Sequence, residues 1–188
     1  MYILYSIKNS CTLTDNIFRK WQTKDNILMT NLKALDKVLN GLKSTSNFHG
    51  LCVTIPHKIE LAKQCNVLMP NAQKIGAVNV AYFNKKRELI GENFDGEGFV
   101  SGLEAKGFSV KGKKIFISGA GGAARGIAFA IAKYKASLIV ISNRTKDKAV
   151  MLSDSIKSWY PDFSVKAIFH TEKIYGDFDY FDQWQNLI

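Results

Sequence analysis

A glycine-rich segment, Gly119-Ala120-Gly121-Gly122-Ala123-Ala124, carries the clearest chemical signal in the sequence. A compact apolar run precedes it and a segment with helical spacing follows, the order in which a dinucleotide-binding turn occurs. Gly119 permits a tight turn, Gly121 lets the backbone approach a pyrophosphate, and Ala124 leaves room for helix and strand to pack. The helix N-terminus adds free N–H groups and partial positive charge. We therefore expect phosphate binding by the backbone of residues 119–123, with an ordinary glycine turn as the alternative.

The segment about 20 residues further on predicts which dinucleotide is bound. An NAD-binding domain usually carries Asp or Glu there to hold the ribose 2′-hydroxyl. This sequence has Asn143-Arg144-Thr145, followed by Lys148. A guanidinium matches a 2′-phosphate by paired hydrogen bonds, so these four residues indicate NADP(H) as the cofactor. The alternative is a solvated basic turn.

Strand-like and helix-like segments alternate along the whole chain, which predicts an α/β fold with mainly parallel sheets. Short apolar or alternating runs indicate strands, and apolar residues at helical spacing indicate helices. Strands are expected over residues 1–6, 27–29, 49–55, 77–83, 88–90, 115–118, 137–142 and 164–169. Helices are expected over residues 13–22, 32–42, 96–106 and 146–158. A further helix is expected to follow Gly119–Gly126 and run to about Lys133, and another to start at Pro56 and run toward Cys65.

The last three expected strands and the helices between them form a βαβαβ unit, one mononucleotide-binding half. We expect an N-terminal α/β lobe over residues 1–96 and a half Rossmann NADP-binding domain over residues 97–188. The helix over residues 96–106 would connect the two domains. The glycine-rich segment and Arg144 then follow neighbouring strands of one sheet.

The composition favours a folded protein in a reducing cytoplasm. The residues are 46% hydrophobic and 12% aromatic, enough for a buried core. No apolar run approaches the roughly 18 residues of a membrane helix, and the N-terminus lacks the basic start of a secretory signal. The three cysteines and three histidines show neither disulfide nor metal-ligand spacing. We expect no metal site and no membrane partner.

The net charge of +10 raises nucleic-acid binding as an alternative function. The lysines are spread along the chain, with only short clusters such as Lys111-Gly112-Lys113-Lys114, and no nucleic-acid-binding motif accompanies them. We therefore expect small anionic ligands and a solvated basic surface, and no nucleic-acid partner.

Three further strings carry a resemblance to a known family. They are Gly50-Leu-Cys-Val-Thr-Ile-Pro-His-Lys58, Gly76-Ala-Val-Asn79 and Gly91-Glu-Asn-Phe-Asp-Gly96. In order and spacing they resemble the shikimate dehydrogenase motifs G-x-N-V-T-x-P-x-K, A-V-N-T and G-x-N-T-D-G. The glycine-rich segment and Asn143-Arg144-Thr145 fit the same family.

The resemblance implies NADP-dependent, reversible reduction of 3-dehydroshikimate to shikimate, a step toward chorismate and the aromatic amino acids. It makes residues 1–96 the substrate-binding and catalytic lobe. Lys58 and Asp95 would be the catalytic pair, and Thr54 and Asn79 would bind substrate hydroxyls. Ser10 and Thr12 would correspond to the family loop Ser-x-Ser-Pro, which holds the substrate carboxylate. A homodimer is an assembly compatible with this interpretation.

Four departures from the family pattern leave other functions open. Cys52 replaces a motif asparagine, Phe94 replaces the threonine before Asp95, and Leu13 replaces the proline of the N-terminal loop. The fourth departure is at the C-terminus, where the sequence diverges after Phe181 and looks truncated. We expect strand 115–118 to lack a fourth-strand neighbour and to leave an open edge. The alternatives are a truncated or degenerate relative that binds NADP(H) with little turnover, and a quinate/shikimate dehydrogenase paralogue.

Overall fold

The computed structural model describes residues 2–6, 27–30, 35–172 and 178–183. Its backbone contacts divide the chain into two units, residues 1–93 and 94–187, three residues before the predicted boundary. The helix predicted over residues 13–22 lies outside the described residues, as do Ser10 and Thr12. None of the described helices is both long and apolar enough to cross a membrane.

The first unit contains a mixed six-stranded sheet in the order β2-β1-β3-β5-β6-β4. Strand β1 runs parallel to both neighbours, while β5 is antiparallel to β3 and β6. The strands are β1 (Tyr2–Ser6), β2 (Ile27–Thr30), β3 (Phe48–Val53), β4 (Val67–Leu68), β5 (Val80–Phe83) and β6 (Leu89–Glu92). The helices are α2 (Leu35–Lys43), α3 (Lys58–Gln64) and α4 (Pro70–Ile75).

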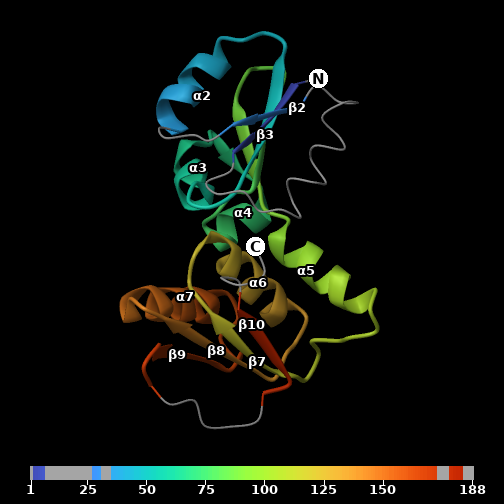
Figure 1. The fold of residues 1–188 in the computed structure, drawn as a ribbon, viewed down its shortest axis with the longest axis vertical. Coiled ribbons are helices and arrows are strands. Elements are labelled where there is room, and N and C mark those ends of the chain that lie inside the picture. The colour runs from blue at the N-terminus through green and yellow to red at the C-terminus, as the bar shows by residue number, and fades with distance from the viewer. Residues whose placement is uncertain (1, 7–26, 31–34, 173–177, 184–188) are drawn as a thin grey trace. The chain divides into compact units, whose positions relative to one another are not determined.

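Helices α2 and α3 lie on the same face of this sheet (Figure 1). The apolar stripe of α2 buries Leu35 and Leu39, and α3 buries Leu61. These side chains join the core with Leu51 of β3 and Leu89 of β6, both at most 1% exposed. Burial of the alternating strand residues therefore fixes which face of the sheet the helices cover.

Helices α3 and α4 of the first unit differ from the sequence prediction, and strand β4 was not predicted. Helix α3 begins at Lys58 and not at Pro56, because residues 54–57 form a turn in which the His57 N–H donates to the Thr54 carbonyl at 2.9 Å. The Ile55–Pro56 peptide bond in this turn is cis. Helix α4 was not predicted, although Pro70 at its first position and left-handed Gly76 at its end, φ 69°, are typical helix boundaries.

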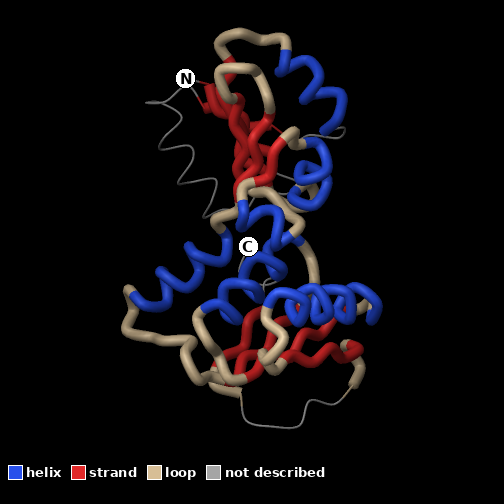
Figure 2. The backbone as a smooth tube through the Cα atoms, turned by 180° about the vertical axis from the view of Figure 1, so that it is seen from behind, coloured by secondary structure: helices blue, strands red, loops and turns tan. Residues whose placement is uncertain are grey.

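The second unit contains a four-stranded parallel sheet in the order β10-β7-β8-β9. Its strands are β7 (Lys114–Ser118), β8 (Leu138–Asn143), β9 (Val165–Phe169) and β10 (Tyr180–Gln183). Its helices are α5 (Asp95–Glu104), α6 (Gly122–Lys133) and α7 (Lys146–Trp159). Helices α6 and α7 cover the same face of the sheet, as both views show (Figures 1 and 2). The predicted βαβαβ unit and the α/β fold class are confirmed.

The prediction that β7 lacks a fourth-strand neighbour is wrong. Strand β10 pairs with β7 in parallel, with Tyr180 opposite Ile115. The Asp179 carboxylate before β10 accepts the Lys114 N–H at 2.9 Å and the Lys113 ammonium at 3.0 Å. The Phe178 ring meets the Phe116 ring edge-on at 5.8 Å. These contacts explain why β10 pairs with β7. The sequence alone did not indicate this pairing, because it diverges from the family pattern after Phe181.

Candidate functional site

The glycine-rich segment forms the turn from β7 into α6. Gly119 has φ 125°, a conformation that suits glycine, and its N–H donates to the Ser142 carbonyl at 2.7 Å. Gly121 precedes α6, and a Cβ atom built on Gly119 or Gly121 would meet nothing within 4 Å. The N-cap residue Gly121 makes no side-chain bond to the first turn of α6, so it leaves the N–H groups of that turn to other partners. The segment thus fits a pyrophosphate lying against the backbone.

The second loop follows β8 and leads into α7. The Asn143 side chain donates to the Thr145 carbonyl at 2.9 Å, and the Lys148 N–H donates to the same carbonyl at 3.1 Å. Thr145 precedes α7 without capping it, and the side chains of Arg144 and Lys148 are exposed. The loop is therefore held by the Asn143 side chain and by its backbone, and Arg144 and Lys148 lie at the surface.

The two loops are neighbours because the strands before them are paired. Ser118 lies opposite Ser142 in the parallel ladder of β7 and β8. Both loops leave the carboxyl edge of the sheet, where ligands of open α/β sheets bind. The structure thus brings together the nine residues predicted to bind the cofactor: Gly119, Ala120, Gly121, Gly122, Ala123, Asn143, Arg144, Thr145 and Lys148.

In the first unit, three of the predicted site residues lie on segments joined by backbone hydrogen bonds. The Val53 N–H donates to the Asn79 carbonyl at 2.8 Å, which connects the end of β3, next to Thr54, with the start of β5. The Val78 N–H donates to the Lys58 carbonyl, also at 2.8 Å. Thr54, Lys58 and Asn79 are therefore on adjoining segments. Lys58 is only 9% exposed, an unusual environment for an ammonium group.

Two buried polar residues beside this group were not predicted to have a role. The Asn93 side chain is 1% exposed and donates to the Ala77 carbonyl at 2.9 Å, fixing the segment before Asn79. His57 is 8% exposed and precedes Lys58. Asn93 belongs to the string Gly91–Gly96, so its position beside the predicted catalytic Asp95 was a usable signal.

Comparison with known proteins relates this arrangement to one family. The sequence profile described as "Shikimate dehydrogenase substrate binding domain" matches residues 6–81. The NADP(+) shikimate dehydrogenase of Moorella thermoacetica is 43% identical over 122 residues, 65% of this chain and 41% of the relative. The corresponding enzyme of Methanopyrus kandleri is 46% identical over 109 residues, 57% of this chain and 37% of the relative. Over these matched segments the chain is similar to shikimate dehydrogenases.

Solved structures support the same relationship over more of the chain. A shikimate dehydrogenase in complex with NADP+ is 32% identical, with a TM-score of 0.72, and the match covers 88% of this chain and 60% of that protein. The Listeria monocytogenes enzyme in complex with shikimate and NAD is 28% identical, with a TM-score of 0.71, over 89% of this chain and 60% of its own. The chain spans less than half the length of the curated relatives it matches.

The family motif Gly91–Gly96 ends in the second unit, at the start of α5. Asp95 is the first residue of this helix and half-buried, whereas Lys58 belongs to the first unit. Gly96 lies so close to α6 that a Cβ atom would overlap the Gly126 carbonyl and come within 2.7 Å of the Ala130 Cβ. The last glycine of the motif therefore permits α5 to pack tightly on the helix that follows the glycine-rich segment.

Two departures from the family motifs have different surroundings. Cys52 on β3 is half-buried, and burial raises the pKa of its thiol, so the neutral form predominates at pH 7. Phe94 precedes α5 and is 52% exposed. Cys52 thus lacks the amide of the motif asparagine and any thiolate character, while Phe94 places an apolar ring next to Asp95.

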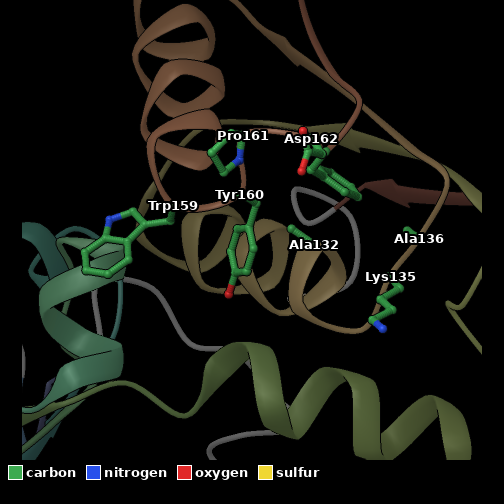
Figure 3. Close-up of a pocket in the computed structure, with 8 residues that line it drawn as sticks. Ala132, Lys135, Ala136, Trp159, Tyr160, Pro161 and Asp162 are labelled. Atoms are coloured by element: carbon green, nitrogen blue, oxygen red, sulfur yellow. The ribbon is translucent and has the colours of Figure 1, made fainter.

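A surface hollow of about 370 Å³ lies elsewhere in the second unit, at the C-terminal ends of α6 and α7 (Figure 3). Trp159, Tyr160 and Pro161 line one part of it, and Ala132 and Lys135 another. Since the glycine-rich segment is at the opposite end of α6, this hollow contains none of the predicted site residues.

Proposed function

We propose that the chain is an NADP-dependent shikimate dehydrogenase-like oxidoreductase, which interconverts 3-dehydroshikimate and shikimate in aromatic amino-acid biosynthesis. The observation that carries the proposal is the buried Lys58 at the first residue of α3, on segments that adjoin Thr54 and Asn79. Burial of an ammonium group costs free energy, so such a lysine is more often kept for function than for stability. The family supplies the substrate class.

The proposed chemistry divides between the two units. NADPH, when bound, supplies the hydride that reduces the ketone carbon. The Lys58 ammonium would donate the proton that the ketone oxygen needs to become a hydroxyl. The Asp95 carboxylate would accept hydrogen bonds from Lys58 and from a substrate hydroxyl and so orient both. Thr54 and Asn79, with Ser10 and Thr12, would bind the remaining hydroxyls and the carboxylate of the substrate.

The proposed cofactor site is the pair of loops in the second unit. The backbone of residues 119–123 would hold the pyrophosphate, which the open space over Gly119 and Gly121 supports. Asn143, Arg144, Thr145 and Lys148 would bind the 2′-phosphate. Arg144→Ala should weaken NADP(H) relative to NAD(H) by about 1.5–3 kcal/mol, the scale of a charged hydrogen bond. Fluorescence titration with both cofactors measures this difference, and equal losses would exclude Arg144 as the specificity residue.

The catalytic assignment is tested by following NADPH absorbance with 3-dehydroshikimate. Lys58→Ala and Asp95→Asn should each lower kcat by about 10²-fold or more, the usual loss of acid–base assistance. Lys63→Ala on the same helix is the control, because Lys63 is exposed and paired only with Glu60 at 3.9 Å among the described residues. Near-normal turnover of both site variants would contradict the assignment.

Two alternatives have specific support. Phe94 and Cys52 favour a relative that binds NADP(H) but turns over little, which cofactor titration without measurable reduction would reveal. A polyol-type substrate other than shikimate is favoured by the likeness to a Gluconobacter 5-ketofructose reductase, 28% identical with a TM-score of 0.74 over 92% of this chain and 63% of that protein. Assays with quinate and shikimate in the oxidative direction separate these possibilities. A cytoplasmic location and a homodimer remain predictions.

A further inference from the structure

Glu172, just after β9, contacts the loop proposed to bind the 2′-phosphate. Its Oε1 lies 3.3 Å from the Lys146 Nζ atom, and Lys146 is the first residue of α7. The loops after β8 and β9 leave the same edge of the parallel sheet, which explains how residues 26 positions apart meet. A carboxylate thus lies beside a loop whose other charged groups include Arg144 and Lys148.

The Glu172 carboxylate is held in place by the backbone. The same Oε1 accepts the Phe169 N–H at 3.0 Å, and the Glu172 N–H donates to the Phe169 carbonyl at 2.9 Å. The Phe169 N–H, and after it Lys146, lower the pKa of Glu172, so this group is ionised at neutral pH. The negative charge is therefore a fixed feature of this edge of the sheet.

We propose that Glu172 is a specificity-determining residue that limits how tightly the loop over residues 143–148 binds a 2′-phosphate. It does so by engaging Lys146 and by adding a negative charge near the phosphate. A ligand with an unmodified 2′-hydroxyl experiences neither effect. The inference rests on the proposed NADP(H) binding and assigns a role to a residue outside the family motifs.

The test compares 2′,5′-ADP with 5′-AMP by calorimetric titration of the full chain. Glu172→Gln keeps an oxygen for the Phe169 N–H but loses the charge. Its Kd for 2′,5′-ADP should fall by roughly threefold to tenfold at low salt, as expected for removing one like charge near a dianion. The gain should shrink at about 0.5 M salt because exposed charges are screened. The Kd for 5′-AMP should not change.

Lys146 provides the matched variants. Lys146→Met alone should alter 2′,5′-ADP binding little, since Glu172 already engages the ammonium. In the Glu172→Gln background the same substitution should remove most of the gain, a coupling that a double-mutant cycle measures. Glu172→Asp, which keeps the charge, should bind like the wild type, and circular dichroism verifies that each variant is folded.

The possible failures are distinguishable. A wild type that prefers 2′,5′-ADP over 5′-AMP, with the same preference in Glu172→Gln, would overturn the inference and leave the proposed cofactor intact. Equal gains for both ligands would also overturn it, because the effect would not involve the 2′-phosphate. The absence of any preference for 2′,5′-ADP in both the wild type and Glu172→Gln would overturn both proposals.

Discussion

The two units position their candidate site residues in different ways. In the second unit the residues occupy two short continuous loops at the ends of paired parallel strands, and one bond from Gly119 to Ser142 joins them. In the first unit they come from separate segments, which are connected by backbone bonds and by the buried Asn93 side chain. The site residues of the second unit are therefore positioned by local backbone geometry. Those of the first unit are positioned by contacts between residues that are distant in the sequence.

Two residues with the same backbone conformation show this difference. Arg87 in the first unit has φ 60° and Lys135 in the second has φ 61°. The Arg87 guanidinium donates to four carbonyls 39 to 45 positions away and lies 4.4 Å from the centre of the Phe83 ring. The exposed Lys135 follows α6 and lines the surface hollow. Both residues have a left-handed backbone conformation. The Arg87 side chain joins distant segments of the first unit, whereas the Lys135 side chain lines a surface hollow of the second.

The largest effect that would test this comparison is expected at Arg87. Arg87→Ala removes all four donated bonds, including the one to the Lys43 carbonyl at the end of α2. We expect a loss of about 2–4 kcal/mol in the free energy of unfolding, because several bonds from one charged group are lost together. Urea denaturation measures it, with Lys86→Ala at the exposed neighbouring position as the control. If Arg87→Ala is no less stable than the control, the first unit does not depend on this long-range contact.

A second test concerns close packing in the second unit. Gly96→Ala would place a methyl group against the Gly126 carbonyl, whereas Gly98→Ala on the same helix would meet nothing within 4 Å. Gly96→Ala should destabilise the protein by about 1–3 kcal/mol through overpacking. Gly98→Ala should stabilise it by about 0.5–1 kcal/mol, since alanine favours a helix over glycine. Thermal unfolding of the pair measures the difference, and similar melting temperatures would contradict the close approach of α5 and α6.

The comparison also explains what the sequence could predict. The cofactor loops were predicted residue by residue, because a glycine turn and the end of a strand are local and leave local patterns. The strand β10 was missed because its pairing depends on Asp179 and Phe178 meeting β7, a contact across more than 60 residues. Glu172 was missed because its contact with Lys146 joins the ends of two strands across 26 residues. The catalytic pair, Lys58 and Asp95, came from the family resemblance and remains a prediction.

A third test uses pH to ask whether side-chain contacts also matter in the second unit. Glu97 of α5 binds the Lys133 ammonium at 2.7 Å and the Tyr134 hydroxyl at 2.8 Å, at the end of α6. Burial alone raises the pKa of Glu97, but the hydrogen bonds from Lys133 and Tyr134 and the charge of Lys133 outweigh it, and the pKa is lowered. Stability from this carboxylate is therefore fully present above its ordinary value near 4.3 and is lost as the pH falls through the lowered pKa.

The corresponding variant is Glu97→Gln. At pH 7 it should be less stable than the wild type by less than about 1 kcal/mol, because the pair is partly exposed and water screens it. The difference should vanish as the pH falls well below 4. Urea denaturation between pH 3 and 7 measures it, with Glu104→Gln, an exposed position on the same helix, as the control. A difference that persists at low pH would mean that Glu97 acts through packing and not through its charge.

The smallest expected effect, at Lys135, is a stabilisation. The Lys135 N–H donates to Ala132 at 3.1 Å, its carbonyl accepts the Gly112 N–H at 2.8 Å, and the next N–H, of Ala136, donates to Ile131 at 3.2 Å. This pattern ends α6 with a left-handed residue, the position where glycine is preferred.

Lys135→Gly keeps these backbone bonds and relieves about 1–2 kcal/mol of left-handed strain, while the more flexible unfolded chain offsets about 0.4–1 kcal/mol. The net gain should be about 0.5 kcal/mol by the same estimates.

Lys135→Ala is the control: it retains the strain and loses the charge, so its stability should match the wild type. Urea denaturation of the two variants separates the causes: equal gains would attribute the effect to the lost charge in a chain of net charge +10. A loss in Lys135→Gly would show that the lysine side chain contributes contacts at the hollow, and that the second unit resembles the first more than the contrast with Arg87 suggests.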